Sequence, residues 1–538
     1  MINIKKNIFL IALLIGFGST PLSAATFEEL VPALGAKSSK QKIKTIEAIA
    51  ATGDERAVHV LEALMEGKLY TQKSDRKVVI TKKSGKVYIL RDPLTSKEIG
   101  QAPKFKLKKI RVNNRLRRII RGVLGGLTLL SKDPVQRAAA ADAVFKSRAT
   151  SAVPTLEKAL ARETDSNAKD KMTAALAATQ LSTAKEPKVR LAALNVLADL
   201  ATPEVRALLS NLAVTEKDAK TKKAIKKALG SVEASLSFWN GIGNVFQGLS
   251  LGSVLLLAAV GLAITFGVMG VINMAHGELV MLGAYTTFMV QEVIRTHFPG
   301  AFDFSIAIAI PLAFMVSGLF GIAIERGVIR YLYGRPLETL LATWGLSLIL
   351  QQFVRSIFGP TNREVGNPSW MSGAAEITGG LTLTYNRIWI IFFSLVVLGL
   401  LFVFLKKSAF GLQMRAVTQN RAMASSMGIK TGYVDALTFG LGSGIAGVAG
   451  VALSQIDNVS PNLGQAYIID SFMVVVFGGV GNLWGTLVGA FSLGIVNKFL
   501  EPFAGTVLAK ILVLVAIILF IQKRPRGLFA LKGRAVEN

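Results

Sequence analysis

The sequence contains no cysteine and only three histidines, His59, His276 and His297, among 538 residues. The absence of thiols excludes disulfides, zinc sites built on thiolates and iron–sulfur clusters. Three scattered histidines also exclude a histidine-rich metal site. The chain has no GxxxxGK[ST], HExxH or GxSxG motif, which argues against ATP binding, zinc proteolysis and serine hydrolysis. The sequence therefore favours a protein that is not an enzyme, and predicts neither a metal nor a cofactor.

Charge and hydrophobicity are unevenly distributed along the chain. Residues 26–235 carry 41 Lys or Arg and 22 Asp or Glu, whereas residues 236–538 carry 19 and 12. Hydrophobic residues make up 51% of the whole chain, and its mean hydropathy is +0.47. The long apolar runs fall in the second half. The sequence therefore predicts a basic soluble part followed by a membrane part.

The first 25 residues have the pattern of a secretory signal peptide. Lys5 and Lys6 precede an apolar run at 8–17, and Ser23-Ala24-Ala25 is a plausible cleavage site. The run is short for a membrane span, although an uncleaved signal anchor is an alternative. Both interpretations place the chain from residue 26 onward outside the cytoplasm.

Residues 26–235 are predicted to form a soluble, mostly helical domain. In 133–160 and 186–213 a proline opens a helix, an arginine follows, and a second proline opens the next helix. A weaker copy occupies 54–67. This pattern predicts HEAT-like helical pairs, which bury their apolar faces against neighbours. Residues 68–100 alternate polar and apolar side chains between turns, which predicts a small β insertion.

The stretch 104–122 holds nine basic residues and no acidic one. Such a stretch can bind nucleic acid or anionic lipid, or it can form a solvated face. Phe105 is its only aromatic residue, so it lacks a stacking platform for single strands. We therefore expect no nucleic acid partner, and a membrane lipid or solvent against this stretch.

Residues 236–538 are predicted to form an α-helical polytopic membrane domain, since each crossing needs about 20 apolar residues. The apolar segments lie at 245–268, 271–291, 304–324, 338–357, 387–405, 432–454, 466–480, 482–500 and 504–521. The seventh and eighth are short and rich in glycine, as in half-helices or a re-entrant hairpin. The sequence therefore predicts eight or nine crossings.

Basic connections set the expected orientation of the spans. The segments 325–336, 406–430 and 523–534 are rich in Lys and Arg, and such loops face the cytoplasm. Counting back from them, the chain enters the first span from outside. The signal peptide and the loop charges thus both predict that the N-terminal domain is outside the cytoplasm.

A polar cluster interrupts the first two apolar segments in GVMGVINMAHGELVMLGAY (267–285). Asn273, His276 and Glu278, with Gly277 between them, could form a loop outside the lipid, a buried structural cluster or part of a solute path. The predicted topology places them near the cytoplasmic ends of these spans. His276 and Glu278 are two positions apart and would point to different faces of a helix, which argues against a metal or acid–base pair.

Other acidic residues of the membrane part have simpler interpretations. Glu325 is adjacent to Arg326 at a span end, which predicts an interfacial position. Asp435 opens a span, where a carboxylate complements the helix dipole. Asp470 is a further candidate for a polar path.

The sequence also contains a possible internal repeat. Residues 270–273 are echoed by 479–482, and residues 277–280 by 485–488, with offsets of about 209 positions. Repeats in transporters often meet at a binding site built from broken helices. Glycine-rich helices also simply pack closely, so both interpretations stay open.

Three stretches together resemble one family: residues 267–285, MRAVTQNRAMASSMGI (414–429) and VVFGGVGNLWGTLVGAF (475–491). They resemble the branched-chain amino acid type permeases of ATP-binding-cassette importers. The resemblance implies a second related permease subunit, two cytoplasmic ATPase subunits that hydrolyse ATP, a periplasmic substrate-binding protein and a bacterial inner-membrane location. A signal peptide and a long extracytoplasmic domain before the permease resemble the first permease subunit of urea importers.

The same resemblance implies an ATPase-coupling segment at Arg415–Gly428. Its candidate residues are Arg415, Asn420, Arg421, Ala422 and Gly428. Arg421 stands where the family's loose Glu-Ala-Ala…Gly motif has its glutamate, so the match is approximate. A helix that merely lies on the membrane surface is the alternative.

These observations predict an ATP-driven importer, with urea as the substrate. Urea needs paired hydrogen-bonding groups without strong charge, and the path candidates are Asn273, Ser471, Asn482 and Thr486, with His276, Gly277 and Glu278 gating or bracing the exit. An importer of branched-chain amino acids or short amides is the alternative; for an amino acid it would use a half-helix N-terminus and an acid. A passive channel would not need the coupling segment, and a receptor would not need so many spans.

Overall fold

A computed structural model describes residues 26–36, 38–52, 54, 56–84, 87–184, 186–377 and 381–529. The predicted signal peptide at 1–25 lies outside these residues. The chain divides into two compact units, and the boundary along the sequence falls between Ser235 and Leu236.

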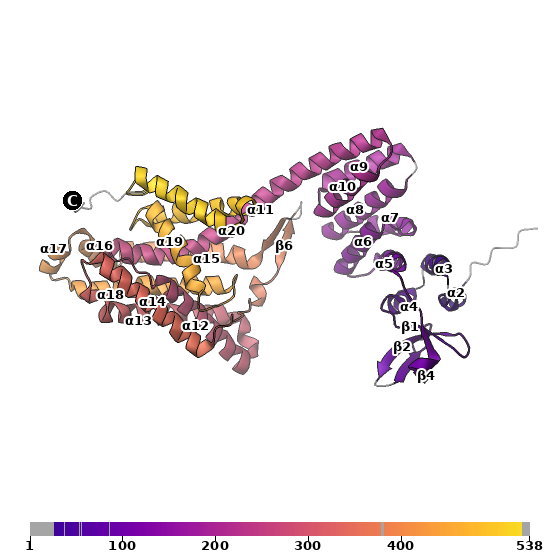
Figure 1. Cartoon of the computed structure of the whole chain (residues 1–538), viewed down its shortest axis with the longest axis horizontal. Helices are drawn as coiled ribbons and strands as arrows, with labels where there is room; N and C mark the ends of the chain where they lie inside the picture. The colour runs from indigo at the N-terminus through magenta and orange to yellow at the C-terminus, as the bar shows by residue number, and fades with distance from the viewer. Residues whose placement is uncertain are drawn as a thin grey trace, which may run out of the picture. The chain divides into compact units, whose positions relative to one another are not determined.

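The N-terminal unit combines helices with one sheet. Its helices begin with α2 (Phe27–Ala33), α3 (Ser39–Thr52) and α4 (Arg56–Met65). An antiparallel sheet of order β4-β3-β2-β1-β5 follows, made of β1 (Leu69–Gln72), β2 (Val78–Ser84), β3 (Val87–Arg91), β4 (Glu98–Pro103) and β5 (Leu107–Lys109). The β insertion predicted near 68–100 falls within this sheet, which continues to Lys109. Figure 1 shows the sheet at one end of the unit.

The basic stretch 104–122 forms β5 and the first half of α5 (Asn114–Thr128). Leu116 and Ile120 are buried in the core of the unit, and α5 packs against α3, α4 and α6. Arg115, Arg117 and Arg121 are exposed. The basic stretch is therefore not a free helix, because its apolar face belongs to the core.

Five further helices complete the stack in this unit, and prolines open most of them. They are α6 (Pro134–Ser147), α7 (Val153–Leu160), α8 (Ser166–Thr183), α9 (Pro187–Leu200) and α10 (Pro203–Thr215). A proline at the first or second helical position costs no hydrogen bond, because the amide there has no intrahelical partner. Side chains of Asp133, Asp165 and Thr202 cap α6, α8 and α10.

The two proline-led segments repeat one ion pair. Arg137 bonds to Glu163 at 2.6 Å, and Arg190 bonds to Glu216, with the same spacing along the chain. Each glutamate also accepts hydrogen bonds from the two backbone amides that follow it. The segments thus share contacts as well as sequence, while their assignment to the HEAT class stays a prediction.

The first of these pairs makes the unit's stability depend on pH. The Arg137 guanidinium bonded to Glu163 lowers the pKa of Glu163 from its ordinary 4.5 to about 2. Because the folded pKa is the lower one, the stabilisation is complete above pH 4.5 and disappears as the pH falls to about 2. We expect Glu163→Gln to destabilise the unit by about 1 kcal/mol at neutral pH and to flatten this acid dependence. Thermal unfolding of residues 26–235 across that range measures both, and unchanged acid sensitivity would contradict the assignment.

The described part of the membrane unit contains eight long helices and a short helical pair. The long ones are α11 (Ala219–Met269), which begins before the unit boundary, α12 (His276–His297), α13 (Ser305–Gly327), α14 (Pro336–Phe358), α15 (Tyr385–Lys407), α18 (Thr431–Ser454), α19 (Leu463–Gly478) and α20 (Leu483–Lys523). The short pair is α16 (Ala409–Gln419) and α17 (Arg421–Ser426), and β6 (Ala374–Ile377) and β7 (Leu381–Thr384) form a hairpin before α15.

The predicted count of eight or nine crossings is not confirmed. Six helices of the described chain are long and apolar enough to span a membrane, and α12 and α19 fall outside that set. The expected segment 271–291 begins instead at His276, because 270–275 is not helical. The expected segment 466–480 corresponds to α19, a helix of 16 residues.

Helix α20 reverses direction at Gly505. This residue has φ 77° and ψ 166°, a left-handed conformation that glycine adopts readily. Gly485, before the break, touches Gly478, and the Phe520 ring, after it, is 5.0 Å from the Phe477 ring. A straight helix would separate 485 from 520 by about 50 Å. Both halves therefore run beside α19 in opposite directions, as the separate segments 482–500 and 504–521 suggest.

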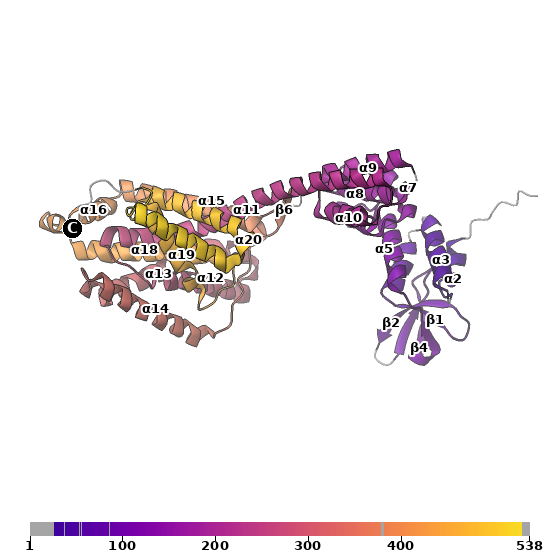
Figure 2. The same cartoon turned by 45° about the horizontal axis from the view of Figure 1, so that its top comes forward.

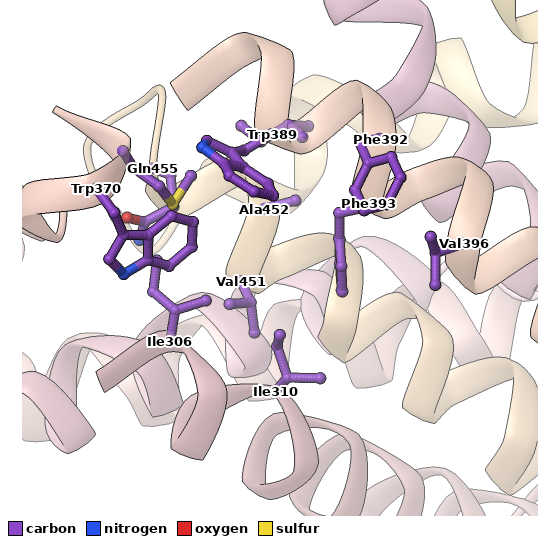
Figure 3. A pocket seen from close by; sticks show the side chains of 12 residues that line it. Ile306, Ile310, Trp370, Trp389, Phe392, Phe393, Val396, Val451, Ala452 and Gln455 are labelled. Atoms are coloured by element: carbon purple, nitrogen blue, oxygen red, sulfur yellow. The ribbon is translucent and has the colours of Figure 1, made fainter. Parts of the chain in front are cut away.

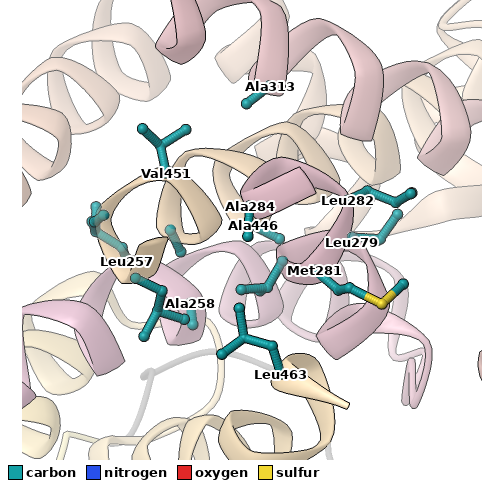
Figure 4. Close-up of a cluster of buried hydrophobic side chains, with 14 of the residues drawn as sticks. Leu257, Ala258, Leu279, Met281, Leu282, Ala284, Ala313, Ala446, Val451 and Leu463 are labelled. Carbon is teal, nitrogen blue, oxygen red and sulfur yellow. The ribbon is translucent and has the colours of Figure 1, made fainter. Parts of the chain in front are cut away.

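Helices α12, α13 and α18 form the centre of the unit and lie together in Figure 2. Small residues let their backbones approach closely. Figure 4 shows Leu279 and Leu282 of α12 among apolar side chains from neighbouring helices, including Ala313 and Ala446. Packing by glycine and alanine, rather than by bulky side chains alone, thus sets the spacing of these helices.

Candidate functional site

The predicted polar cluster lies in the non-helical segment between α11 and α12. Gly270, with φ 67°, ends α11 and turns the chain back along the bundle. The backbone amide of Met274 donates to Thr343 of α14 at 3.1 Å, and the His276 ring bonds to the carbonyl of Ala258, well inside α11. The expected position near the cytoplasmic span ends stays a prediction. The segment reaches into the bundle because it folds back instead of continuing the helix.

Asn273 stabilises this turn from within. Its side chain is 1% exposed, and its Oδ1 accepts a hydrogen bond from the amide of Ala275 at 3.0 Å. In the described part of the chain, its Nδ2 has no hydrogen-bond partner. Irregular backbone in a membrane protein needs such internal partners, because lipid supplies none.

One hydrogen bond of the His276 ring fixes its tautomer. Nε2 donates to the carbonyl oxygen of Ala258 at 2.8 Å, since a carbonyl can only accept. Nδ1 is then an acceptor, and it is buried without a hydrogen-bond partner among the residues described. The ring therefore presents a free acceptor inside the bundle.

Glu278 lies two residues further along the chain, in the first turn of α12. Its Oε1 accepts from Nε2 of Gln351 at 2.7 Å, and that amide also lies 3.4 Å from the Ser347 hydroxyl. The residue is 2% exposed, and its Oε2 has no hydrogen-bond partner within the described ranges. Sequence reasoning missed Gln351 and Ser347, although their spacing of four on an apolar helix marks one polar face.

Gly277 brings two helix beginnings together. A Cβ on Gly277 would be 2.6 Å from the carbonyl oxygen of Gly464, so the backbones are in contact. Gly464 is the second residue of α19, and Gly277 the second of α12. The partial positive ends of two helix dipoles thus lie close to the polar cluster.

The other three path candidates lie elsewhere, along α19 and α20. The Ser471 hydroxyl donates to the carbonyl of Tyr467 at 2.8 Å, and the Thr486 hydroxyl donates to that of Asn482 at 3.0 Å. Asn482 accepts from the amides of Trp484 and Gly485, and so caps α20. These bonds are local to their own helices, whereas Asn273, His276 and Glu278 gather in one turn.

The internal echo corresponds to a shared local structure. Asn273 and Asn482 both follow a glycine with positive φ by three residues, and both accept a backbone amide at the start of the next helix. They differ in burial, since Asn482 is only half-buried and also donates to the carbonyl of Phe529. The echo therefore corresponds to two similar helix starts, and a paired binding site stays a prediction.

The predicted coupling segment forms α16 and α17. Asn420 caps α17 by accepting from the amide of Met423 at 2.9 Å, and Gly428, with φ 83°, ends it. Arg415 donates to the carbonyl of Leu405 at the end of α15. Ala422 is exposed on α17, beside the exposed Met423. The segment thus offers an apolar surface outside the bundle.

Arg421 forms an ion pair that the sequence did not reveal. It bonds to both carboxylate oxygens of Asp435, which is fully buried in the first turns of α18. The expected role of Asp435 as a dipole complement is therefore incomplete. Glu325, expected at the interface beside Arg326, is 1% exposed and accepts a hydrogen bond from the Tyr333 hydroxyl. The sequence signal for this ion pair was the acidic Asp435 at the start of a span, soon after the basic segment 406–430.

The end of α17 supports a direct test. At Gly428 an alanine must adopt a left-handed backbone that costs about 1 kcal/mol. We expect Gly428→Ala to loosen α17 and to weaken co-purification of ATPase subunits severalfold, without loss of the folded permease. Gly432→Ala is the control, since a Cβ there meets nothing within 4 Å of the described structure. Equal co-purification of the ATPase subunits with both variants would contradict a role of α17 in binding them.

A separate cavity of about 240 Å³ lies between α13, α15 and α18 (Figure 3). Trp370 and Trp389 pack edge to face at one end, with ring centroids 5.2 Å apart. Gln455 is the one polar residue among the residues that line it. An apolar lining offers little to a polar solute, so we do not assign this cavity to the solute path.

The fold and these polar turns define a polytopic helical membrane permease. Residues 244–521 match the family described as the permease component of the branched-chain amino acid transport system. The chain belongs to this family. The match begins after the N-terminal unit, so residues 26–235 lie outside it.

Named relatives are similar over the same region. The chain is 32% identical to the high-affinity branched-chain amino acid transport system permease protein LivH of Salmonella typhimurium, over 53% of this chain and 94% of the relative. It is 29% identical to the corresponding protein BraD of Pseudomonas aeruginosa, over 52% of this chain and 93% of that relative. A shorter stretch is 30% identical to the ribose import permease protein RbsC of Bacillus subtilis, covering 22% and 41%. No solved structure matches the chain.

The comparisons support a multi-pass inner-membrane permease, and the relatives are transport permeases, not enzymes. ATP hydrolysis in separate subunits is consistent with this family. They do not support urea as the substrate. The alternative, a branched-chain amino acid permease, fits the relatives better.

Proposed function

We propose that this chain is the membrane subunit of an ATP-driven importer of branched-chain amino acids. We also propose that the non-helical segment 270–275 and the first turn of α12, together called the α12 turn, lie on the solute path. The observation that carries the proposal is the buried start of α12, where one carboxylate oxygen of Glu278 has no hydrogen-bond partner among the residues that the structure describes. An amino acid has one anionic and one cationic group. A helix N-terminus attracts the first and a carboxylate the second.

Buried polar groups without partners support a path better than a purely structural brace. Each such group costs about 1–3 kcal/mol if it stays unsatisfied. Asn273, His276 and Glu278 each carry one polar atom without a partner in the described ranges, one donor and two acceptors in all. A solute or water molecule that reached any one of these atoms would satisfy it, so the cost would then be intermittent.

The proposed assembly follows the family. A second related permease completes the membrane part, and two cytoplasmic ATPases engage α16 and α17. A periplasmic binding protein delivers the solute. The basic connections at 325–336, 406–430 and 523–534 support a cytoplasmic location for α16 and α17, and the predicted signal peptide supports a periplasmic location for residues 26–235. Closure of the ATPases would then move α17 and open the path by alternating access.

Urea is the second candidate substrate. The observation in its favour is the N-terminal unit, a long domain placed before the permease and outside the family match. The neutral groups Asn273 and His276 also suit an amide and a carbonyl. Glu278 favours the amino acid, since urea carries no ammonium group.

Uptake by the complete reconstituted complex tests the substrate. We expect labelled leucine to enter proteoliposomes, and unlabelled leucine, but not urea, to compete. Labelled urea uptake that excess leucine leaves unchanged would replace the amino acid with urea. Uptake of ribose in preference to both would contradict the assignment to either substrate.

A further inference from the structure

A cluster of charged side chains joins the coupling segment to the bundle. Asp435 of α18 is fully buried, and Glu325 at the end of α13 is 1% exposed. Arg421, the first residue of α17, bonds to both oxygens of Asp435, and its side chain is 44% exposed. A cation that remains half in solvent thus reaches a carboxylate inside the bundle.

Tyr333 connects the two carboxylates. Its hydroxyl donates to Oε1 of Glu325 at 2.9 Å, and the Arg421 guanidinium lies over its ring at 4.7 Å. Arg326 lies 3.6 Å from the other Glu325 oxygen, too far for a hydrogen bond. Arg421, Tyr333, Asp435 and Glu325 therefore link α17, the α13–α14 turn and two spans in one contact network.

This network is a strong attachment for a short helix. Helix α17 has six residues, of which Ala424 is buried. Moving Arg421 away would leave the Asp435 carboxylate buried without a cation, which is strongly unfavourable. Displacement of α17 is thus easier if α18 moves with it.

Helix α18 leads from this network to the polar turn. It packs against α12 and α13 along its length. The contacts of Gly283 with Gly447, and of Gly450 with Val280, put the backbones of the two helices in direct contact. A movement of α18 therefore reaches the helix that carries His276 and Glu278.

We infer that Arg421, Asp435 and Tyr333 form a latch that transmits movement of α17 to α18 and so to α12. They are positioning residues, and the inference rests on the proposed function. Arginine suits the latch better than lysine, because its planar guanidinium can fork around a carboxylate while it stacks on a ring, whereas an ammonium group cannot do both at once. In the latch, the arginine therefore serves geometry as well as charge.

The test is the number of leucine molecules transported per ATP hydrolysed by the complete complex in proteoliposomes. The main variant is R421Q/D435N, which removes the latch without leaving an unpaired buried charge. We expect ATP hydrolysis to continue and the ratio to fall about fivefold or more. Arg421→Lys should lower the ratio to an intermediate value, and Lys407→Gln, at an exposed basic position before α16, should leave it unchanged.

The outcomes separate the inference from the proposed function. A wild-type ratio in the double variant overturns the latch. Failure of the double variant to assemble, judged by co-purification of the ATPases, also overturns it, because the pair would then be needed for structure. A wild-type complex that hydrolyses ATP but moves no leucine overturns the proposed function instead and says nothing against the contacts.

Discussion

Glu278→Gln is expected to lower leucine uptake by about tenfold or more while the complex still assembles. Glutamine keeps an oxygen that can accept from Gln351 Nε2, so the 2.7 Å hydrogen bond survives. What disappears is the negative charge, and with it the attraction for an ammonium group. A loss of about 1.4 kcal/mol of interaction with the passing solute corresponds to tenfold. Initial uptake rates of variant and wild-type complexes measure it.

The control for this experiment is Glu292→Gln. Glu292 lies on the same helix, but it is exposed and paired with Arg295 at its surface. The same change of charge there should leave uptake unchanged. Gln351→Leu gives a second comparison, since it leaves the Glu278 carboxylate without its partner and should impair assembly as well. If Glu278→Gln transported leucine normally, the α12 turn would be a structural brace and not a path.

Gly283→Ala is expected to prevent accumulation of folded permease. A Cβ at this position would overlap the carbonyl oxygen and the backbone of Gly447, so α12 and α18 would have to separate. Overpacking of this kind costs about 3 kcal/mol or more when backbone atoms must move. That is a large share of the stability of an ordinary domain. The yield of monodisperse protein after detergent extraction measures the effect.

Gly399→Ala is the matched control, because a Cβ there meets nothing within 4 Å in the described structure. Both glycines lie inside long apolar helices, so helix propensity changes equally. Alanine at 399 should preserve or slightly raise the yield. Equal yields for the two variants would show that α12 and α18 do not pack as closely as described.

The sequence predicted the helical elements better than their depth in the bundle. Hydropathy located most long helices, since each needs a long apolar run. It misplaced the start of α12, because the apolar residues at 271 and 272 belong to a segment that folds back. A window of hydropathy averages over such a reversal. The position of His276 beside Ala258 depends on contacts 18 residues apart, which no local pattern contains.

For the candidate residues too, the sequence predicted local roles better than contacts between helices. Asn273 and Asn482 were paired by sequence similarity, and each does stabilise a helix start. Their difference in burial could not be foreseen, because similar local turns occur in different surroundings. Arg421 was placed in the coupling segment, but its partner Asp435 is on another helix. Spacing along a chain identifies neighbours on one helix, not partners between helices.

ATP dependence of uptake tests the central claim most directly. The measurement compares labelled leucine uptake in proteoliposomes that contain the permease, its partner permease, both ATPases and the binding protein, with and without ATP on the side of α16 and α17. The account predicts uptake with ATP, accumulation above the external concentration, and background uptake without ATP. Equal uptake without ATP, reaching only equilibrium, would contradict it and indicate a passive channel.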